Sequence, residues 1–344
     1  MAKKKRINLA LQGGGAHGAF TWGVLDRLLQ EDEIEICGIS GTSAGALNGA
    51  ALKAGYVRNG RKGARANLDW LWGQVAGTND LRMGDWMMPF GLSALSNAIE
   101  YSWPVAMANA VGMVTTPYTY GPFYRNPLTD IVAKFDYDKI CGQVAPFLHV
   151  CATRVRNGKI KVFSGDEISA DALMASACLP TVFKAVEIFD PSTDQVEAFW
   201  DGGYTGNPAL FPLFTGETPD DIVIININPL EREALPVTAK QIQNRINEIS
   251  FNSSLLRELR AIDFVQRLLD EGKVSTTELS RVRVHMIADD TLMEQLSVAT
   301  KMVPNVAVIG RLKAAGQAAA EAFLAEHKNK IGQESSVNLR EMFA

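Results

Sequence analysis

The chain opens with apolar runs that alternate with amphipathic stretches. Residues 7–12 form an apolar run of strand type, and a second such run covers residues 34–40. Between them Phe20, Val24 and Leu28 recur at a spacing of four, which gives a helix one apolar face suited to covering a sheet. This order of strand, helix and strand predicts the start of a parallel sheet with helices on its faces.

Strand patterns resume in the second half of the chain. Residues 147–153 and 159–163 have strand character, and the pair Asn157-Gly158 between them predicts a hairpin. Residues 221–227 are almost continuously β-branched, which indicates a buried central strand. We expect further strands at 186–188, 198–200 and 282–287, helices at 57–75, 169–177, 237–249, 254–271 and 305–327, and a mobile polar tail at 329–344. The predicted fold class is α/β, a three-layer sandwich with a mostly parallel central sheet.

Residues 77–126 differ from the rest of the chain. They are dense in methionine, tryptophan, proline and other aromatic residues and keep no regular period. We expect an apolar insertion that forms a cap or pocket wall; an ordinary packed excursion is the alternative. Residues 101–124 carry no charge, but their prolines and glycines suit a membrane-spanning helix poorly, so we do not expect a span there.

Composition narrows the class of protein. The chain has 344 residues, 47% of them hydrophobic, enough for one α/β domain over residues 7–328, of which 217–328 form a C-terminal extension. A net charge of −4 gives no reason to expect nucleic acid as a partner. The four cysteines lack C-x-x-C spacing and indicate buried thiols. The basic tail, residues 1–6, is followed by no apolar region long enough for a signal peptide, so we expect a cytoplasmic protein.

The stretch Gly41-Thr42-Ser43-Ala44-Gly45 carries the first candidate chemistry. It lies between the expected strand 34–40 and a run of small residues, 46–54, that predicts a helix closed by Gly55. A strand, G-x-S-x-G and a helix in this order form a nucleophile elbow, in which a tight turn presents the serine hydroxyl. A glycine-rich turn without chemistry is the alternative.

A second glycine motif follows the first strand. Residues 13–18 match G-x-G-x-x-G, the dinucleotide fingerprint, but no acidic residue ends the next strand, where that fold places its ribose ligand. Backbone amides freed by consecutive glycines also form an anion nest. Because successive strand-to-helix turns lie on one edge of a parallel sheet, we expect an oxyanion hole made by the amides of Gly13, Gly14, Gly15 and Ala44.

A nucleophilic serine needs a base. In a Ser-Asp-His order the histidine would be His285 or His327, but only one strand precedes Ser43, unlike the α/β-hydrolase arrangement. Asp201 is the remaining candidate, because it ends a strand and is followed by Gly202 and Gly203. A carboxylate in a partly dry pocket has a raised pKa and is a better base for a serine proton.

Together these motifs resemble the patatin-like phospholipase family, over about residues 7–210. The resemblance also includes the segment 175–183, with its alanine-serine, proline and phenylalanine positions. It implies a patatin-like fold with a Ser-Asp dyad, Ser43 as nucleophile and Asp201 as base, and neither metal nor cofactor. The motif positions that support these residues are His17, Gly18, Gly41, Gly45, Gly202 and Gly203. The family often has arginine or lysine where this chain has His17, which weakens the expectation of a phospholipid head group more than that of hydrolysis.

The leading hypothesis is therefore a serine hydrolase of lipid carboxylic esters that works through an acyl-enzyme. Residues 84–124 would house the acyl chain or make transient contact with a membrane or lipid surface. Two alternatives stay open: an acyltransferase with the same dyad, and a nucleotide-binding protein that uses the glycine loop for phosphate.

Overall fold

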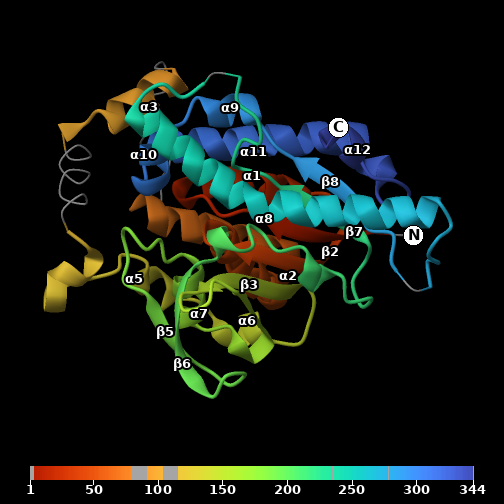
Figure 1. Cartoon of the computed structure of the whole chain (residues 1–344), viewed down its shortest axis with the longest axis horizontal. Helices are drawn as coiled ribbons and strands as arrows, with labels where there is room; N and C mark the ends of the chain where they lie inside the picture. The colour runs from red at the N-terminus through yellow and green to blue at the C-terminus, as the bar shows by residue number, and fades with distance from the viewer. Residues whose placement is uncertain (1–3, 79–90, 104–114, 234, 278, 344) are drawn as a thin grey trace.

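A single eight-stranded sheet organises the molecule. The computed structural model describes the whole chain except residues 1–3, 79–90, 104–114, 234, 278 and 344 (Figure 1). The strand order is β5-β6-β3-β2-β1-β7-β8, with β4 paired to β3 outside this path. The strands are β1 (Lys5–Leu11), β2 (Ile34–Thr42), β3 (Phe147–Arg154), β4 (Ile160–Ser164), β5 (Val186–Asp190), β6 (Gln195–Asp201), β7 (Asp221–Ile225) and β8 (Arg283–Ile287). Strands β3, β2, β1, β7 and β8 run parallel, while β4, β5 and β6 pair antiparallel.

Helices cover both faces of the sheet. The longer ones are α1 (Gly18–Leu28), α2 (Ala44–Ala76), α3 (Leu92–Glu100), α8 (Ala239–Asp270) and α11 (Val306–His327). The short ones are α5 (Thr129–Val132), α6 (Tyr137–Cys141), α7 (Ala170–Ser176), α9 (Asp290–Glu294), α10 (Val298–Met302) and α12 (Leu339–Met342). The 3-10 helices are η1 (Gly15–His17), η3 (Pro117–Phe123), η4 (Gly165–Glu167), η5 (Gly202–Tyr204), η6 (Phe211–Leu213) and η7 (Lys328–Lys330).

The alternation of side chains along the central strands divides the core in two. In β7, Val223 and Ile225 belong to the larger core, which includes buried residues of α1, α2 and α11. Ile222 and Ile224 point to the other face, where they join residues of α8. Figure 1 shows α8 running across this second face. The predicted three-layer α/β architecture with a mostly parallel sheet is confirmed.

The strand predictions agree with the structure to within a few residues. Asn157-Gly158 turns the chain between β3 and β4, which pair antiparallel, and Gly158 has a φ of 66°. β7 is buried along its whole length and lies between β1 and β8. All four cysteines are free thiols.

Several boundaries differ from the predictions. The helix expected to end at Gly55 continues as α2 to Ala76, with a kink where Asn59 and Gly60 leave helical geometry. The two helices expected at 237–249 and 254–271 form the single helix α8. The first two residues of β1 belong to the expected basic tail.

The polar segment after residue 328 is packed against the domain. Ile331 and Leu339 are buried in the two cores. The amide of Gly332 donates a hydrogen bond of 2.7 Å to Asp221 Oδ1. The expectation of a mobile tail is therefore wrong, because apolar residues spaced within the polar sequence anchor it.

The expected apolar insertion lies partly outside the described residues, which omit 79–90 and 104–114 of it. Of its described parts, α3 buries Leu92, Leu95 and Ser96, and η3 begins at Pro117. No helix in the described part of the chain is long and apolar enough to cross a membrane.

Candidate active site

Ser43 occupies the turn between β2 and α2, in a strained backbone conformation. Its φ of 54° and ψ of −123° lie in a region that residues other than glycine seldom adopt. The two glycines of the motif permit the turn because they let backbones touch. A Cβ on Gly41 would lie 2.7 Å from the carbonyl oxygen of Gly45, and one on Gly45 would lie 2.2 Å from that of Leu11.

The side chain of Ser176 connects this turn to β3 by two hydrogen bonds. Its hydroxyl oxygen accepts a 2.9 Å hydrogen bond from the amide of Ser43 and donates one of 2.6 Å to the carbonyl oxygen of Cys151. Ser176 is fully buried at the end of α7, so the bridge is shielded from water. In the sequence, Ser176 stands out only as part of the family-like segment 175–183, because nothing local indicates which amide its hydroxyl contacts.

Sheet register brings Asp201 to the same place. Thr42, which precedes the nucleophile, lies opposite Cys151 of β3, and the next residue, Ala152, lies opposite Asp201 of β6. Strand β3 thus stands between the serine and the carboxylate, at one level of the sheet. A Cβ on Gly202 would lie 3.0 Å from Cγ2 of Thr42, so the chain after Asp201 returns toward the elbow.

Asp201 is a buried carboxyl with one free oxygen. Oδ1 accepts a 2.7 Å hydrogen bond from the amide of Gly203, whereas Oδ2 has no partner in hydrogen-bond geometry among the described residues. Burial raises the pKa of Asp201 to about 7, against the smaller lowering effects of the Gly203 amide and the Ser43 hydroxyl. The Ser43 hydroxyl lies near enough to lower this pKa slightly, although the two side chains are outside hydrogen-bond geometry. The structure brings Ser43 and Asp201 together.

The glycine loop lies directly against Ser43. A Cβ on Gly13 would lie 2.7 Å from Cβ of Ser43. The amide of Gly13 donates a 2.6 Å hydrogen bond to Oδ1 of Asn207, so it is engaged within the protein and differs from our expectation of a free donor. The amides of Gly14, Gly15 and Ala44 have no acceptor in the described part of the chain. These three remain the candidate donors to an oxyanion.

Buried amide side chains brace the loop from behind. Oε1 of Gln12 accepts hydrogen bonds from the amides of Ile227 and Asn228, at 2.8 and 3.1 Å. Nδ2 of Asn228 donates to the carbonyl oxygen of Gly13 at 2.9 Å. Asn252 of α8 accepts a 3.2 Å bond from Nε2 of Gln12. The loop is thus fixed by side chains from distant parts of the sequence.

A model of the patatin-like phospholipase family matches residues 9–214, more than half of the chain. The chain belongs to the patatin-like phospholipase family. The match includes the glycine loop, the elbow and Asp201, whereas β7, β8, α8 and α11 lie beyond it.

Other comparisons are more distant. No curated protein shows significant sequence similarity to this chain. The crystal structure of VipD from Legionella pneumophila resembles it with a TM-score of 0.43 and 14% identity, covering 94% of this chain and 67% of that one. This likeness is too distant to support a functional argument.

His17, where the family often has a cation, is a neutral buried side chain. Nε2 lies 2.7 Å from Oγ1 of Thr300, whose own proton goes to the carbonyl oxygen of Ser297 at 2.6 Å. His17 Nε2 must therefore be the donor, which leaves Nδ1 without a proton and without a partner among the described residues. Burial, and then the charge of Lys301, lower the pKa of His17 well below its ordinary value.

A lysine lies behind the glycine loop. Nζ of Lys301 donates to Oδ1 of Asn228 at 2.8 Å, and the backbone carbonyl of Lys301 touches Gly15, where a Cβ would come within 2.3 Å of it. Burial lowers the pKa of Lys301 to about 8, and the charge of Glu248 acts against that shift. The positively charged side chain of Lys301 therefore lies behind the glycine loop, whereas the loop position His17 is neutral.

The remaining motif glycines make close contacts. A Cβ on Gly18 would lie 2.7 Å from that of Ala44, and one on Gly202 would lie 2.2 Å from the carbonyl oxygen of Cys151. A Cβ on Gly203 would lie 3.0 Å from Oδ1 of Asp201. Side chains at these positions would push apart the elements that carry the dyad.

The histidines considered for a triad bond elsewhere. Nε2 of His285 lies 3.1 Å from Oδ1 of Asp221, and the ring packs edge-on against Phe323. His327 lies at the end of α11, 3.7 Å from Glu326. Neither histidine has a hydrogen bond to Ser43 or Asp201. Among the residues that the structure describes, no group of three or more histidine, cysteine, aspartate or glutamate side chains could hold a metal ion.

Proposed function

We propose that this member of the patatin-like phospholipase family hydrolyses lipid carboxylic esters with Ser43 as nucleophile and Asp201 as general base. The family supports a lipid acyl hydrolase. Asp201 takes the proton of the Ser43 hydroxyl while Oγ attacks the ester carbonyl carbon. The amides of Gly14, Gly15 and Ala44 donate hydrogen bonds to the oxyanion that forms. Collapse of this intermediate returns the proton to the alcohol and leaves an acyl-enzyme, which water hydrolyses with Asp201 again as base.

The single observation that carries the proposal is the state of Asp201. A carboxylate of ordinary pKa is too weak a base to help a serine at neutral pH. Burial raises the pKa of Asp201 to about 7. The carboxyl also has one oxygen, Oδ2, without a hydrogen-bond partner among the described residues, and the Ser43 hydroxyl contributes to its pKa. A base is most effective when its pKa is near the working pH, so this carboxyl suits the role without a histidine.

The described surface supports transient contact with a lipid surface. In the described parts of the insertion, Tyr101 and Trp103 are 78% and 74% exposed, and Tyr118 is 61% exposed. Aromatic side chains of this kind favour the interface between water and lipid. We therefore propose that this side of the molecule meets the substrate aggregate. Flotation with phosphatidylcholine vesicles measures the contact, and Trp103→Ser should reduce the bound fraction.

Labelling with a fluorophosphonate tests the chemistry. The reagent should modify Ser43, as found by peptide mapping, and Ser43→Ala should abolish both labelling and hydrolysis of lipid esters. The loss in kcat is expected to be about 10⁴-fold or more. His285→Ala serves as the control and should keep labelling, because His285 bonds to Asp221. Labelling of wild-type protein at a different serine would refute the assignment.

A further inference from the structure

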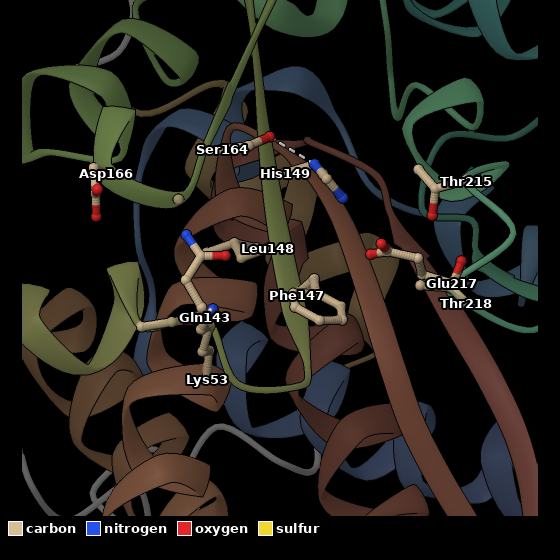
Figure 2. Close-up of a pocket in the computed structure, with 12 residues that line it drawn as sticks. Lys53, Gln143, Phe147, Leu148, His149, Ser164, Asp166, Thr215, Glu217 and Thr218 are labelled. Carbon is tan, nitrogen blue, oxygen red and sulfur yellow. Dashed lines mark hydrogen bonds between the residues drawn. The ribbon is translucent and has the colours of Figure 1, made fainter.

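A cavity lined mainly by polar residues lies at the amino end of β3. Its volume is about 290 Å³, and its wall includes Phe147 and Leu148, the first two residues of β3. Phe147 lies opposite Gly38 of the parallel strand β2, which ends at Thr42 just before Ser43. Figure 2 shows the polar side chains around the cavity: Lys53, Gln143, His149, Ser164, Thr215 and Glu217.

Lys53 is an uncompensated cation in the wall of this cavity. The residue is only 2% exposed, and its Nζ donates a 2.8 Å hydrogen bond to the carbonyl oxygen of Gly142. No carboxylate lies within 4.0 Å of Nζ in the described part of the chain. Burial lowers the pKa of Lys53, as expected for an ammonium group without a counter-ion. Burying an unpaired charge is unfavourable by several kcal/mol, and an anion in the cavity would relieve this.

Neutral polar groups line the same space. Nδ1 of His149 lies 2.6 Å from Oγ of Ser164, which fixes the imidazole ring at the cavity wall. Burial lowers the pKa of His149, with a further contribution from Lys53, so the ring is neutral. Gln143 and Thr215 make no side-chain hydrogen bond to another described residue and can donate to a ligand. These donors add hydrogen bonds to the attraction of Lys53.

The carboxylates of the cavity lie on its outside. Asp166 and Glu217 are exposed, whereas Lys53 is buried. In Figure 2 Glu217 stands with Thr215 across the cavity from Gln143. A ligand that fits this distribution has its negative group inward and hydrogen-bond donors outward. A polyanion would meet the carboxylates and fits less well.

We propose that this cavity binds a small carboxylate that carries an ammonium or hydroxyl group at its other end, with its carboxylate on Lys53. Neither Ser43 nor Asp201 lines this cavity, so the site does not depend on the proposed hydrolysis. Its polar wall also distinguishes it from a site for an acyl chain. The inference therefore adds a polar small-molecule site to a lipid hydrolase.

Calorimetric titration with three probes tests this at pH 7.5 and constant chloride. Serine has both ends of the proposed ligand, acetate has only the carboxylate, and ethanolamine has only the donors. Serine should bind most tightly, acetate more weakly, and ethanolamine not measurably. Loss of a hydrogen bond to a charged group weakens binding by roughly 10- to 100-fold, so Lys53→Met should reduce serine affinity by about that factor. Lys62→Met, an exposed lysine of the same helix, is the matched control and should bind like wild type.

Glu217→Gln keeps the test decisive if Lys53→Met fails to fold, because residue 217 is exposed. This variant should bind acetate more tightly and lose part of the preference for serine over acetate. The proposal is overturned if wild-type protein binds none of the carboxylates at millimolar concentration, or if Glu217→Gln leaves that preference unchanged. Fluorophosphonate labelling of Ser43, measured in parallel, reports separately on the proposed hydrolase.

Discussion

Two sites in the molecule each bury an ionisable group that lacks an opposite charge. Beside the elbow it is Asp201, and in the wall of the cavity at the amino end of β3 it is Lys53. The neighbours of Asp201 are backbone groups fixed by glycines, whereas Lys53 lines an open cavity with polar side chains. Fixed amides suit a transient charge in a reaction, and a roomy polar cavity suits a ligand. The arrangement around a buried charge, more than the charge itself, distinguishes the two sites.

The largest effect is expected when the charge at the elbow is removed. Asp201→Asn should lower kcat/KM for a lipid ester by about 10⁴-fold, because the serine loses its base. The same change should stabilise the protein at pH 8. The folded-state pKa of about 7 exceeds the ordinary 3.8, so wild type loses stability as pH rises through about 7, and asparagine avoids that loss.

Thermal unfolding at pH 8 and pH 4 measures this second effect. The gain in Tm for Asp201→Asn should be present at pH 8 and small at pH 4, where the carboxyl of wild type is largely protonated. An equal gain at both pH values would show that the carboxyl is not unusual. Full activity of Asp201→Asn would show that Asp201 is not the base.

A smaller effect follows from pH alone. In the proposed mechanism the active form of Asp201 is the carboxylate, so kcat/KM should fall about tenfold for each pH unit below about 7 and level off above it. A water-soluble short-chain ester measured from pH 5 to 8 gives the profile. A rate that stays constant down to pH 5 would contradict the raised pKa.

The smallest effect is expected from loosening the elbow. Ser176→Ala removes the acceptor of the Ser43 amide, with a net loss of roughly 1 kcal/mol and about a tenfold fall in kcat. Ser176→Thr keeps the hydroxyl and should recover part of the rate. Ser192→Ala, in the turn between β5 and β6, is a control that should leave the rate unchanged. An unchanged rate in Ser176→Ala would mean that the strained turn needs no such support.

The parts of the site that could be predicted from the sequence are those with local geometry. Ser43 and Asp201 belong to motifs whose glycines indicate a tight turn and the end of a strand. Asn207, Asn228 and Ser176 act through contacts with residues more than 130 positions away, and no local pattern indicates such partners.

One wrong prediction has the same cause. The sequence predicted separate helices at 237–249 and 254–271, yet the residues between them lie within α8. Asn252 bonds to Gln12 behind the glycine loop, and Oγ of Ser254 accepts the amide of Asn207. Tertiary contacts thus outweighed the weak helix propensity of these residues. Residues at the expected break between two helices thus brace the proposed active site.

The position of β7 has a consequence for dissecting this protein. Strand β1, which carries the glycine loop, pairs with β7 along Asn8 to Leu11, although β7 begins after the family-matched region ends at residue 214. Helices α1 and α11 also touch backbone to backbone, since a Cβ on Gly23 would lie 2.0 Å from the carbonyl oxygen of Lys313. A fragment that ends at the family boundary would expose an unpaired strand and an apolar helix face near Ser43, the proposed nucleophile. Such a fragment would aggregate before it could act on a substrate.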